Sequence, residues 1–341
     1  MDFLRHILTD MVTGLIGPFV KIAQAGHYRL FWPYLLVATA IAYVVYRRAR
    51  AAREPEAAGG FLAFVLPRAL WRHRSAATDI GVLLVTSVVL ALALPLIMPE
   101  TKAITRWLLA TVAPSAGVTA ASPSTWQLAV FTLALLVVGD FARFFAHYLG
   151  HRVPAWWELH KVHHAAEVLT PFTAYRFHPI DVALTILIVT CLLGTANALF
   201  ILAWGEGLQV VTLFHANAGL VVFNLLGGVL RHSHIWVSFG PRIERYLVSP
   251  AMHQIHHSCE PRHWGKNLGY HLSIWDRMFG SIYIPQTREH FELGLGEETA
   301  ALRGVAASMV RPLIGAARAL IPTALRRAGR AAEPTEPAAR N

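Results

Sequence analysis

The sequence predicts an all-α protein: a polytopic membrane helix bundle with a cytosolic, histidine-rich helical cap. Three observations lead to this prediction. The 341 residues are 55% hydrophobic and only 15% charged, a composition typical of integral membrane proteins. Long apolar segments recur through most of the chain, and 14 of the 18 histidines fall between His147 and His271. We therefore expect one membrane domain whose helices carry a metal site at a membrane face.

Five apolar segments are candidate membrane spans, since about 20 apolar residues are needed to cross the hydrocarbon core as a helix. Arg47, Arg48 and Arg50 follow the first segment directly and place that end in the cytoplasm. The predicted topology has an outer N-terminus, with both histidine-rich blocks on the cytoplasmic side. The fourth and fifth segments can instead form a hairpin that enters the bilayer partway. The predicted spans are residues 30–46, 80–98, 126–149, 180–204 and 207–226.

The chain divides into three predicted parts. Residues 1–125 hold an N-terminal interfacial segment and two transmembrane helices, and residues 126–290 hold the histidine-rich domain. Residues 291–341 are read as a basic amphipathic segment followed by a disordered tail. The net charge of +10 is spread around apolar segments, which favours attraction to anionic lipid and gives no reason to expect nucleic acid as a partner. Two cysteines, Cys191 and Cys259, exclude a disulfide framework.

The histidines recur at short, repeated spacings. Two His-x-x-His-His triplets are accompanied by one His-x-x-x-His pair and one His-x-His pair. Residues at i, i+3 and i+4 share a helix face, so each triplet is predicted to present three imidazoles to one point. Neutral imidazole binds Zn, Cu, Fe and Ni, and a set this dense predicts two metal ions held by nitrogen. The candidate ligands are His147, His151, His160, His163, His164, His232, His234, His253, His256 and His257.

Other polar residues have less specific interpretations. Asp140 lies on one helical stripe with His147 and His151 and can orient a ligating histidine as a carboxylate acceptor. Pairing of Asp140 with Arg143, or with another internal donor, is equally consistent with the sequence. His178 and His215 are weaker ligand candidates, of which His178 can cap or orient a loop, whereas a structural role is favoured for His263 and His271.

The number of candidate ligands bears on the chemistry. Structural zinc prefers closed Cys/His sites, and hydrolytic zinc needs about three ligands and a nearby carboxylate base. Ten histidines exceed either requirement, whereas two redox-active irons with open positions for O₂ account for the excess. A site that caps apolar helices is accessible to a lipid from the bilayer. We therefore expect oxidation of an unactivated C–H bond of a lipid.

Several motifs carry a resemblance to a known family. They are DFARFFAHYLGH (140–151), WELHKVHH (157–164), RFHP (176–179), HSH (232–234), SPAMHQIHH (249–257) and NLGYHLSIWDRMFG (267–280). With them, residues 126–285 resemble the fatty acid hydroxylase/sterol desaturase superfamily of membrane non-haem di-iron enzymes. The resemblance implies two Fe ions, O₂ as co-substrate, and hydroxylation or desaturation of a membrane lipid, which can be a sterol, a fatty acyl chain or a related lipid.

The resemblance also assigns residues. By motif position the ten histidines above are iron ligands, with His234 the least secure because relatives vary there. Asn267 is placed with Asp140 in the catalytic set; Asn-Leu-Gly stands here where many relatives have Asn-Tyr-Gly, a departure expected to alter packing rather than metal binding. Asp276 is expected to anchor the cap through hydrogen bonds.

The sequence shows no c-type haem motif and no cytochrome-like or ferredoxin-like domain, so electrons are expected from a separate donor. A cytochrome b5-like protein or a ferredoxin/reductase system fits, and an acidic protein suits the basic cytosolic face. The inner or plasma membrane of a bacterium is the expected location. The competing interpretations are a membrane acyl desaturase with three histidine boxes, and a bis-histidine haem or metal-binding membrane protein without oxygenase activity.

Overall fold

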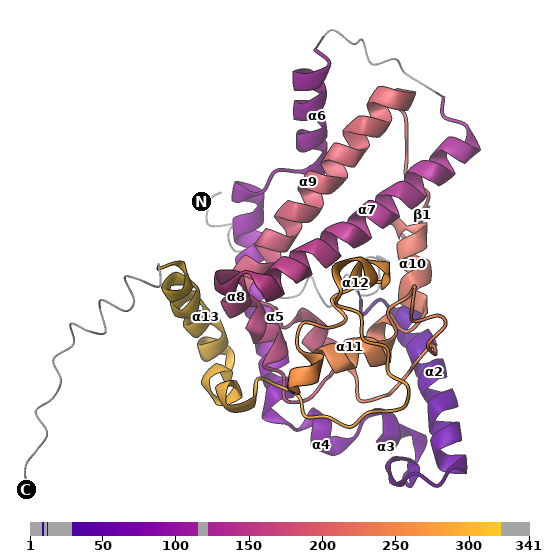
Figure 1. Cartoon of the computed structure of the whole chain (residues 1–341), viewed down its shortest axis with the longest axis vertical. Helices are drawn as coiled ribbons and strands as arrows, with labels where there is room; N and C mark the ends of the chain where they lie inside the picture. Colours follow the sequence, from indigo (N-terminus) through magenta and orange to yellow (C-terminus); the bar gives the residue numbers. More distant parts are fainter. Residues whose placement is uncertain (1–8, 10–11, 13–28, 115–121, 322–341) are drawn as a thin grey trace, which may run out of the picture.

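The computed structural model describes residues 9, 12, 29–114 and 122–321 (Figure 1). This part of the chain is almost wholly helical, with a single hairpin of two short strands, which confirms the predicted all-α class. The predicted interfacial segment and C-terminal tail lie largely outside the described residues. The α-helices are α2 (Trp32–Ala51), α3 (Phe61–Val65), α4 (Arg68–Trp71), α5 (Arg74–Ile97), α6 (Thr101–Val112), α7 (Thr125–Arg152), α8 (Pro154–His164), α9 (Pro179–Trp204), α10 (Ala218–Leu225), α11 (Pro250–His256), α12 (Ile274–Phe279) and α13 (Val305–Leu320).

Shorter elements connect these helices. Strands β1 and β2 pair antiparallel just before α10. Five 3₁₀ turns join other helices or lie in the loops of the cap. These elements are β1 (Thr212–Leu213), β2 (Ala216–Asn217), η1 (Pro55–Ala57), η2 (Pro171–Tyr175), η3 (Gly228–His232), η4 (Pro261–His263) and η5 (Gly296–Leu302).

Within the described residues, three helical stretches are long and apolar enough to cross a membrane: 74–112, which contains α5 and α6, then α7 and α9. Helices α7 and α9 run side by side, with α6 against α9 (Figure 1). Local sequence sets their ends. Ser124 and Gln127 form a capping box at the start of α7. His178 caps α9, with Pro179 at its first position, and Gly205, at φ +86°, ends it.

The prediction of five spans is wrong, because two of the predicted segments are not among these three stretches. Residues 207–226 do not form one long helix: Gly207 adopts φ +105°, the hairpin β1–β2 follows, and α10 has only eight residues. The first predicted span does form a helix, α2, of 20 residues. It is not among the three stretches apolar enough to cross, and Arg48 and Arg50 occupy its last turn.

A buried ion pair fixes the histidine-bearing cap to the long helices. Asp79 of α5 and Arg176, which follows η2, lie 3.1 Å apart with both side chains almost fully buried. Thr173 donates to the same carboxylate at 2.5 Å. The Arg176 Nε atom donates to the carbonyl of Val162 in α8 at 2.9 Å. This network joins α5, α8 and η2, and so positions the end of α8 that carries two adjacent histidines.

A separate hydrophobic cluster supports the η3 segment. Tyr34, Ala38 and Ala42 on one face of α2 pack with Val221 of α10 and Leu230 of η3. Alanine at two of these positions allows close approach of the elements. The cluster therefore holds η3, which ends at His232, against the first helix of the bundle.

Candidate metal centre

Nine of the ten candidate histidines converge in two adjacent groups. In each group, one ring nitrogen from every histidine lies within 4.8 Å of the nitrogens of the others. Helices α7, α8 and α11 and the turn η3 contribute eight of the side chains, and His257 directly follows α11. The five-histidine group is His147, His151, His160, His164 and His256, and the four-histidine group is His163, His232, His253 and His257.

The two His-x-x-His-His triplets are divided between the groups. In α8, His160 and His164 belong to the five-histidine group, whereas His163 belongs to the four-histidine group. At the end of α11, His256 joins the five-histidine group while its neighbour His257 joins the other. The prediction that each triplet points to one place is therefore wrong. Consecutive residues on a helix do not face each other, so adjacent histidines serve neighbouring centres.

The outer ring nitrogens of the five-histidine group are held by hydrogen bonds. The Nδ1 atoms of His147 and His256 lie 2.8 Å from the carbonyl oxygens of Leu268 and Lys266. His160 Nδ1 lies 3.0 Å from the carboxylate of Asp181. Such acceptors fix Nδ1 as the protonated nitrogen and leave Nε2 unprotonated, with a lone pair available to a metal ion. The Nε2 atoms of all five rings are buried and have no hydrogen-bond partner among the described residues.

The four-histidine group closes around His232. Its Nε2 atom lies 3.3 Å from His163 Nε2, 3.0 Å from His253 Nε2 and 3.2 Å from His257 Nε2. The Nε2 atom of a neutral His232 either donates or accepts one hydrogen bond, so it cannot make hydrogen bonds to all three neighbours at once. Bonds of about 2.0–2.1 Å from nitrogen to a metal ion place neighbouring ligands about 3.0–3.4 Å apart, which matches the observed spacings.

The environment keeps these imidazoles in the ligating form. Burial, reinforced by the positive charge that neighbouring histidines would carry, lowers the pKa of His163, His164 and His232 well below 6.5. The same causes act on His253, His256 and His257. The rings are therefore neutral near pH 7, with lone pairs available to a metal ion. The donor set, its burial and its free nitrogens fit two metal ions.

Three predicted site residues lie outside both groups. His234 Nε2 lies 2.7 Å from the carbonyl of Phe64, because alternate residues of the extended His232–His234 stretch point in opposite directions. Asp140 is the acceptor for His271 Nδ1 at 3.0 Å and for Trp275 Nε1 at 3.0 Å, so its partner is not a ligating histidine. The carboxylate instead anchors the segment that follows Tyr270.

Asn267 ties the cap together. Its side-chain amide donates to the carbonyl of Met252 at 3.0 Å and accepts from the backbone N–H of Tyr283 at 2.7 Å. Its φ of +55° suits asparagine, which tolerates the left-handed region. Asp276 accepts from the backbone N–H groups of Leu268 and Gly269 at 2.8 and 2.9 Å, which confirms its predicted anchoring role.

The other histidines have structural contacts. His178 accepts from the backbone N–H of Ile180, as expected of a cap, and its Nε2 contacts the carbonyl of Met309. His271 is buried and bonded to Asp140, and burial lowers its pKa to about 4. His263 is fully buried beside Glu289, 3.2 Å away. His215 lies in the hairpin at φ +61°, outside both groups.

Two residues that support the centre were missed in the sequence. Asp181, in the first turn of α9, binds His160 and also accepts from Trp156 Nε1 at 2.7 Å. Phe177 stacks on His163 with ring centroids 4.0 Å apart and planes 15° from parallel. The only signals were a carboxylate at the start of an apolar span and an aromatic residue inside the RFHP motif.

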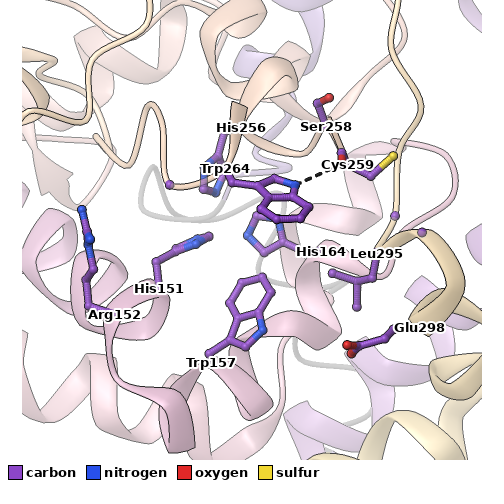
Figure 2. A pocket seen from close by; sticks show the side chains of 13 residues that line it. His151, Arg152, Trp157, His164, His256, Ser258, Cys259, Trp264, Leu295 and Glu298 are labelled. Carbon is purple, nitrogen blue, oxygen red and sulfur yellow. Dashed lines mark hydrogen bonds between the residues drawn. The ribbon is translucent and has the colours of Figure 1, made fainter. Parts of the chain in front are cut away.

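Two cavities reach the centre through different ligands. The larger, of about 550 Å³, is lined by His151, His164 and His256 of the five-histidine group. Figure 2 shows these three rings with Trp157 and Trp264 beside them, and Glu298 at the rim. The smaller, of about 220 Å³, is lined by ligands of both groups and by apolar residues of α9, with Phe177 next to them.

Comparison with known proteins agrees with this geometry. A family model described as fatty acid hydroxylase matches residues 132–281, the stretch that carries all nine converging histidines. The matched stretch is less than half of the 341 residues, and this part of the chain is similar to the fatty acid hydroxylase family. No solved structure matches the chain.

Similar curated proteins include enzymes of three kinds. An ornithine lipid hydroxylase of Rhizobium tropici is 27% identical over 196 residues, covering 56% of this chain and 52% of that protein. The human alkylglycerol monooxygenase is 29% identical over 161 residues, covering 47% and 31%. A Delta(7)-sterol 5(6)-desaturase of Aspergillus fumigatus is 30% identical over 155 residues, covering 45% and 39%. The chain thus spans about half or less of the length of these relatives.

Proposed function

We propose that this chain is a member of the fatty acid hydroxylase family and a membrane-bound non-haem di-iron oxygenase that hydroxylates or desaturates a lipid. The observation that carries the proposal is the pair of adjacent histidine groups, in each of which one nitrogen from every ring lies within 4.8 Å of the nitrogens of the others. The relatives named above are a lipid hydroxylase, a monooxygenase and a desaturase, which supports a lipid as the substrate.

The groups would hold one iron each, and the bound irons would supply the reduction of O₂ needed to oxidise an unactivated C–H bond. Hydroxylation replaces C–H by C–OH and consumes one O₂, two electrons and two protons, with one water released. Desaturation removes two hydrogens from adjacent carbons and releases two waters for the same input. Nitrogen-only ligation adds no negative charge, unlike the carboxylate-rich sites of soluble di-iron bundles. The protein's own contribution is to fix the ring orientations through Asp181 and the two backbone carbonyls.

A haem protein fits the geometry less well. Two axial histidines of a haem lie on opposite faces of a planar macrocycle, which needs space between the rings. Here three Nε2 atoms lie 3.0–3.3 Å from that of His232, so no plane of that size fits between them.

The two cavities suggest separate routes. The smaller cavity is lined by Val182, Thr185 and Ile186 of α9, a helix apolar enough to face lipid, and is assigned to the substrate. The larger cavity is lined by Arg152 and Glu298 as well as by histidines, and is assigned to water, protons and electron entry. A separate donor, cytochrome b5-like or a ferredoxin/reductase system, would approach there, at the cytoplasmic face of the membrane.

The test is metal content and product on the same preparation. Full-length protein in detergent should contain about two irons per chain by elemental mass spectrometry and show no Soret band. A preparation loaded with zinc would be reconstituted with iron before the number of irons per chain is measured. Membranes that contain the protein and an electron donor should then yield a lipid with one ¹⁸O atom from ¹⁸O₂, or a lipid lacking two hydrogens. Haem, or iron-loaded protein without any oxidised lipid, would overturn the proposal.

A further inference from the structure

We propose that the smaller cavity binds the anionic headgroup of the lipid through Arg29, Arg143 and Arg231, so that the oxidised carbon lies within a few bonds of that headgroup. This inference rests on the proposed function and specifies its substrate class. All three arginines line the cavity together with His147, His160, His163, His232 and His253.

The three guanidinium groups gather around one tyrosine. Arg29 lies 5.0 Å from the centre of the Tyr270 ring and its Nε atom donates to the Tyr270 hydroxyl at 3.3 Å. Arg143 lies 5.3 Å from the same ring. Arg231 donates to the backbone carbonyl of Tyr270. Tyr270 therefore holds three positive charges on one wall of the cavity.

These charges lack a carboxylate partner. Among the described residues, none of the three arginines makes a salt bridge, and the buried Nε atom of Arg231 has no hydrogen-bond partner. Arg231 is only 9% exposed. The carboxylates nearest in the fold are already engaged: Asp181 with Trp156 and His160, and Asp140 with the 271–275 segment.

An unpaired buried cation is costly, by several kcal/mol per ion, and a bound anion offsets this cost. The planar fork of arginine matches the oxygens of a carboxylate or phosphate. The free Nε of Arg231 and the unused donors of Arg29 and Arg143 supply such a receptor. Iron held by neutral histidines would add further positive charge to the same space, which strengthens the preference for an anion.

The size of the cavity limits how much of the lipid enters. A volume of about 220 Å³ lies below the roughly 300–1,000 Å³ of pockets that enclose a drug-sized ligand. It accommodates a small headgroup and a few carbons, but not a long acyl chain. The remaining chain would lie along α9, where Val182 and Ile186 line the cavity. The carbons close to the headgroup are therefore the ones that approach the histidines.

The experiment measures binding without turnover, on full-length iron-loaded protein in nanodiscs of neutral lipid, without O₂ or reductant. The probes are hexadecyl phosphate, hexadecanol and inorganic phosphate. Their binding is measured by the change in tryptophan fluorescence. The test variant is Arg143→Gln. The control is Arg47→Gln, because Arg47 also lies over a tyrosine ring, at 5.9 Å from that of Tyr43, but is exposed. Tyr270→Phe provides a second test variant that keeps the ring and removes the hydrogen bond to Arg29.

Hexadecyl phosphate should bind at least tenfold more tightly than hexadecanol, since a hydrogen bond to a charged group contributes about 1.5–3 kcal/mol, or roughly ten- to a hundredfold. Arg143→Gln should weaken the binding of hexadecyl phosphate about tenfold and leave the binding of hexadecanol unchanged. Arg47→Gln should change neither affinity.

Inorganic phosphate should compete only weakly with hexadecyl phosphate if the site takes a lipid. Strong competition by inorganic phosphate, which has no chain, would overturn the headgroup assignment. Equal affinity for hexadecyl phosphate and hexadecanol would also refute the headgroup assignment. So would an equal loss of affinity for these two probes in Arg143→Gln and Tyr270→Phe. Oxidation of a neutral lipid by the same protein would keep the proposed function while rejecting this inference.

Discussion

Replacement of Asp181 by asparagine tests whether hydrogen bonding outside the metal ligands tunes the centre. The two carboxylate oxygens of Asp181 accept from Trp156 Nε1 at 2.7 Å and from His160 Nδ1 at 3.0 Å. Asparagine is nearly the same size but offers one acceptor oxygen and one NH₂ group. One of the two donors must then face another donor, in a site where Asp181 is only 3% exposed.

We expect Asp181→Asn to weaken metal binding in the five-histidine group by about 10- to 100-fold, the usual effect of losing such a partner, or about 1.4–2.7 kcal/mol. The assay is iron retained per chain during dialysis against a graded chelator series. Glu158→Gln is the matched control: it removes one negative charge from the same helix as His160, but its side chain is partly exposed and pairs with Lys161. Retention equal to wild type in Asp181→Asn, or an equal loss in Glu158→Gln, would show that the carboxylate does not orient His160.

Three further predictions concern other parts of the centre. His256→Ala and His163→Ala should each lose metal and turnover while the protein still inserts into membranes, whereas His234→Ala should retain both irons because its ring bonds to Phe64; full iron in His256→Ala would reject the ligand assignment. Phe177→Ala should weaken metal binding mainly in the four-histidine group, by about 0.5–1.5 kcal/mol from the lost stacking on His163, and metal titration should then show a larger loss of affinity at one site than at the other. Asp79→Ala should destabilise the protein by about 3–5 kcal/mol, because it leaves Arg176 buried and unpaired; unchanged thermal unfolding in detergent would contradict this account of the α5–cap connection.

The convergence of the histidines was largely predictable from the sequence because their spacing is local. The spacing in His-x-x-x-His and His-x-x-His-His patterns determines which histidines share a face of a single helix. Helices α7, α8 and α11 form where these patterns lie. The division of His163 from His164, and of His256 from His257, was not predictable in the same way. This division depends on how α8 and α11 pack against the other elements, and the residue spacing within a single helix does not predict that packing.

Other differences have similar causes. Asp181 binds a histidine 21 positions earlier in the chain, so no local pattern reveals the contact. Residues 207–226 are apolar throughout most of their length, which is why they resemble a span. Apolar composition alone does not distinguish a hairpin and a short helix from a crossing helix. The glycines at 205 and 207 indicated where the preceding helix ends but did not predict the strands that follow.

The division of adjacent histidines between the two groups has a consequence for assembly of the cofactor. One peptide unit joins His163 to His164, and another joins His256 to His257, so the two metal positions share the same two backbone segments. Ordering α8 and the end of α11 around a first ion would also fix the histidines that these segments contribute to the second position. The conformational entropy of these segments would therefore be lost on binding the first ion and not again on binding the second. A second ion would therefore bind to a preorganised receptor, and partially loaded protein would be a minor species. Loading would be cooperative as a result, and loss of either ion would loosen the chelate that retains the other.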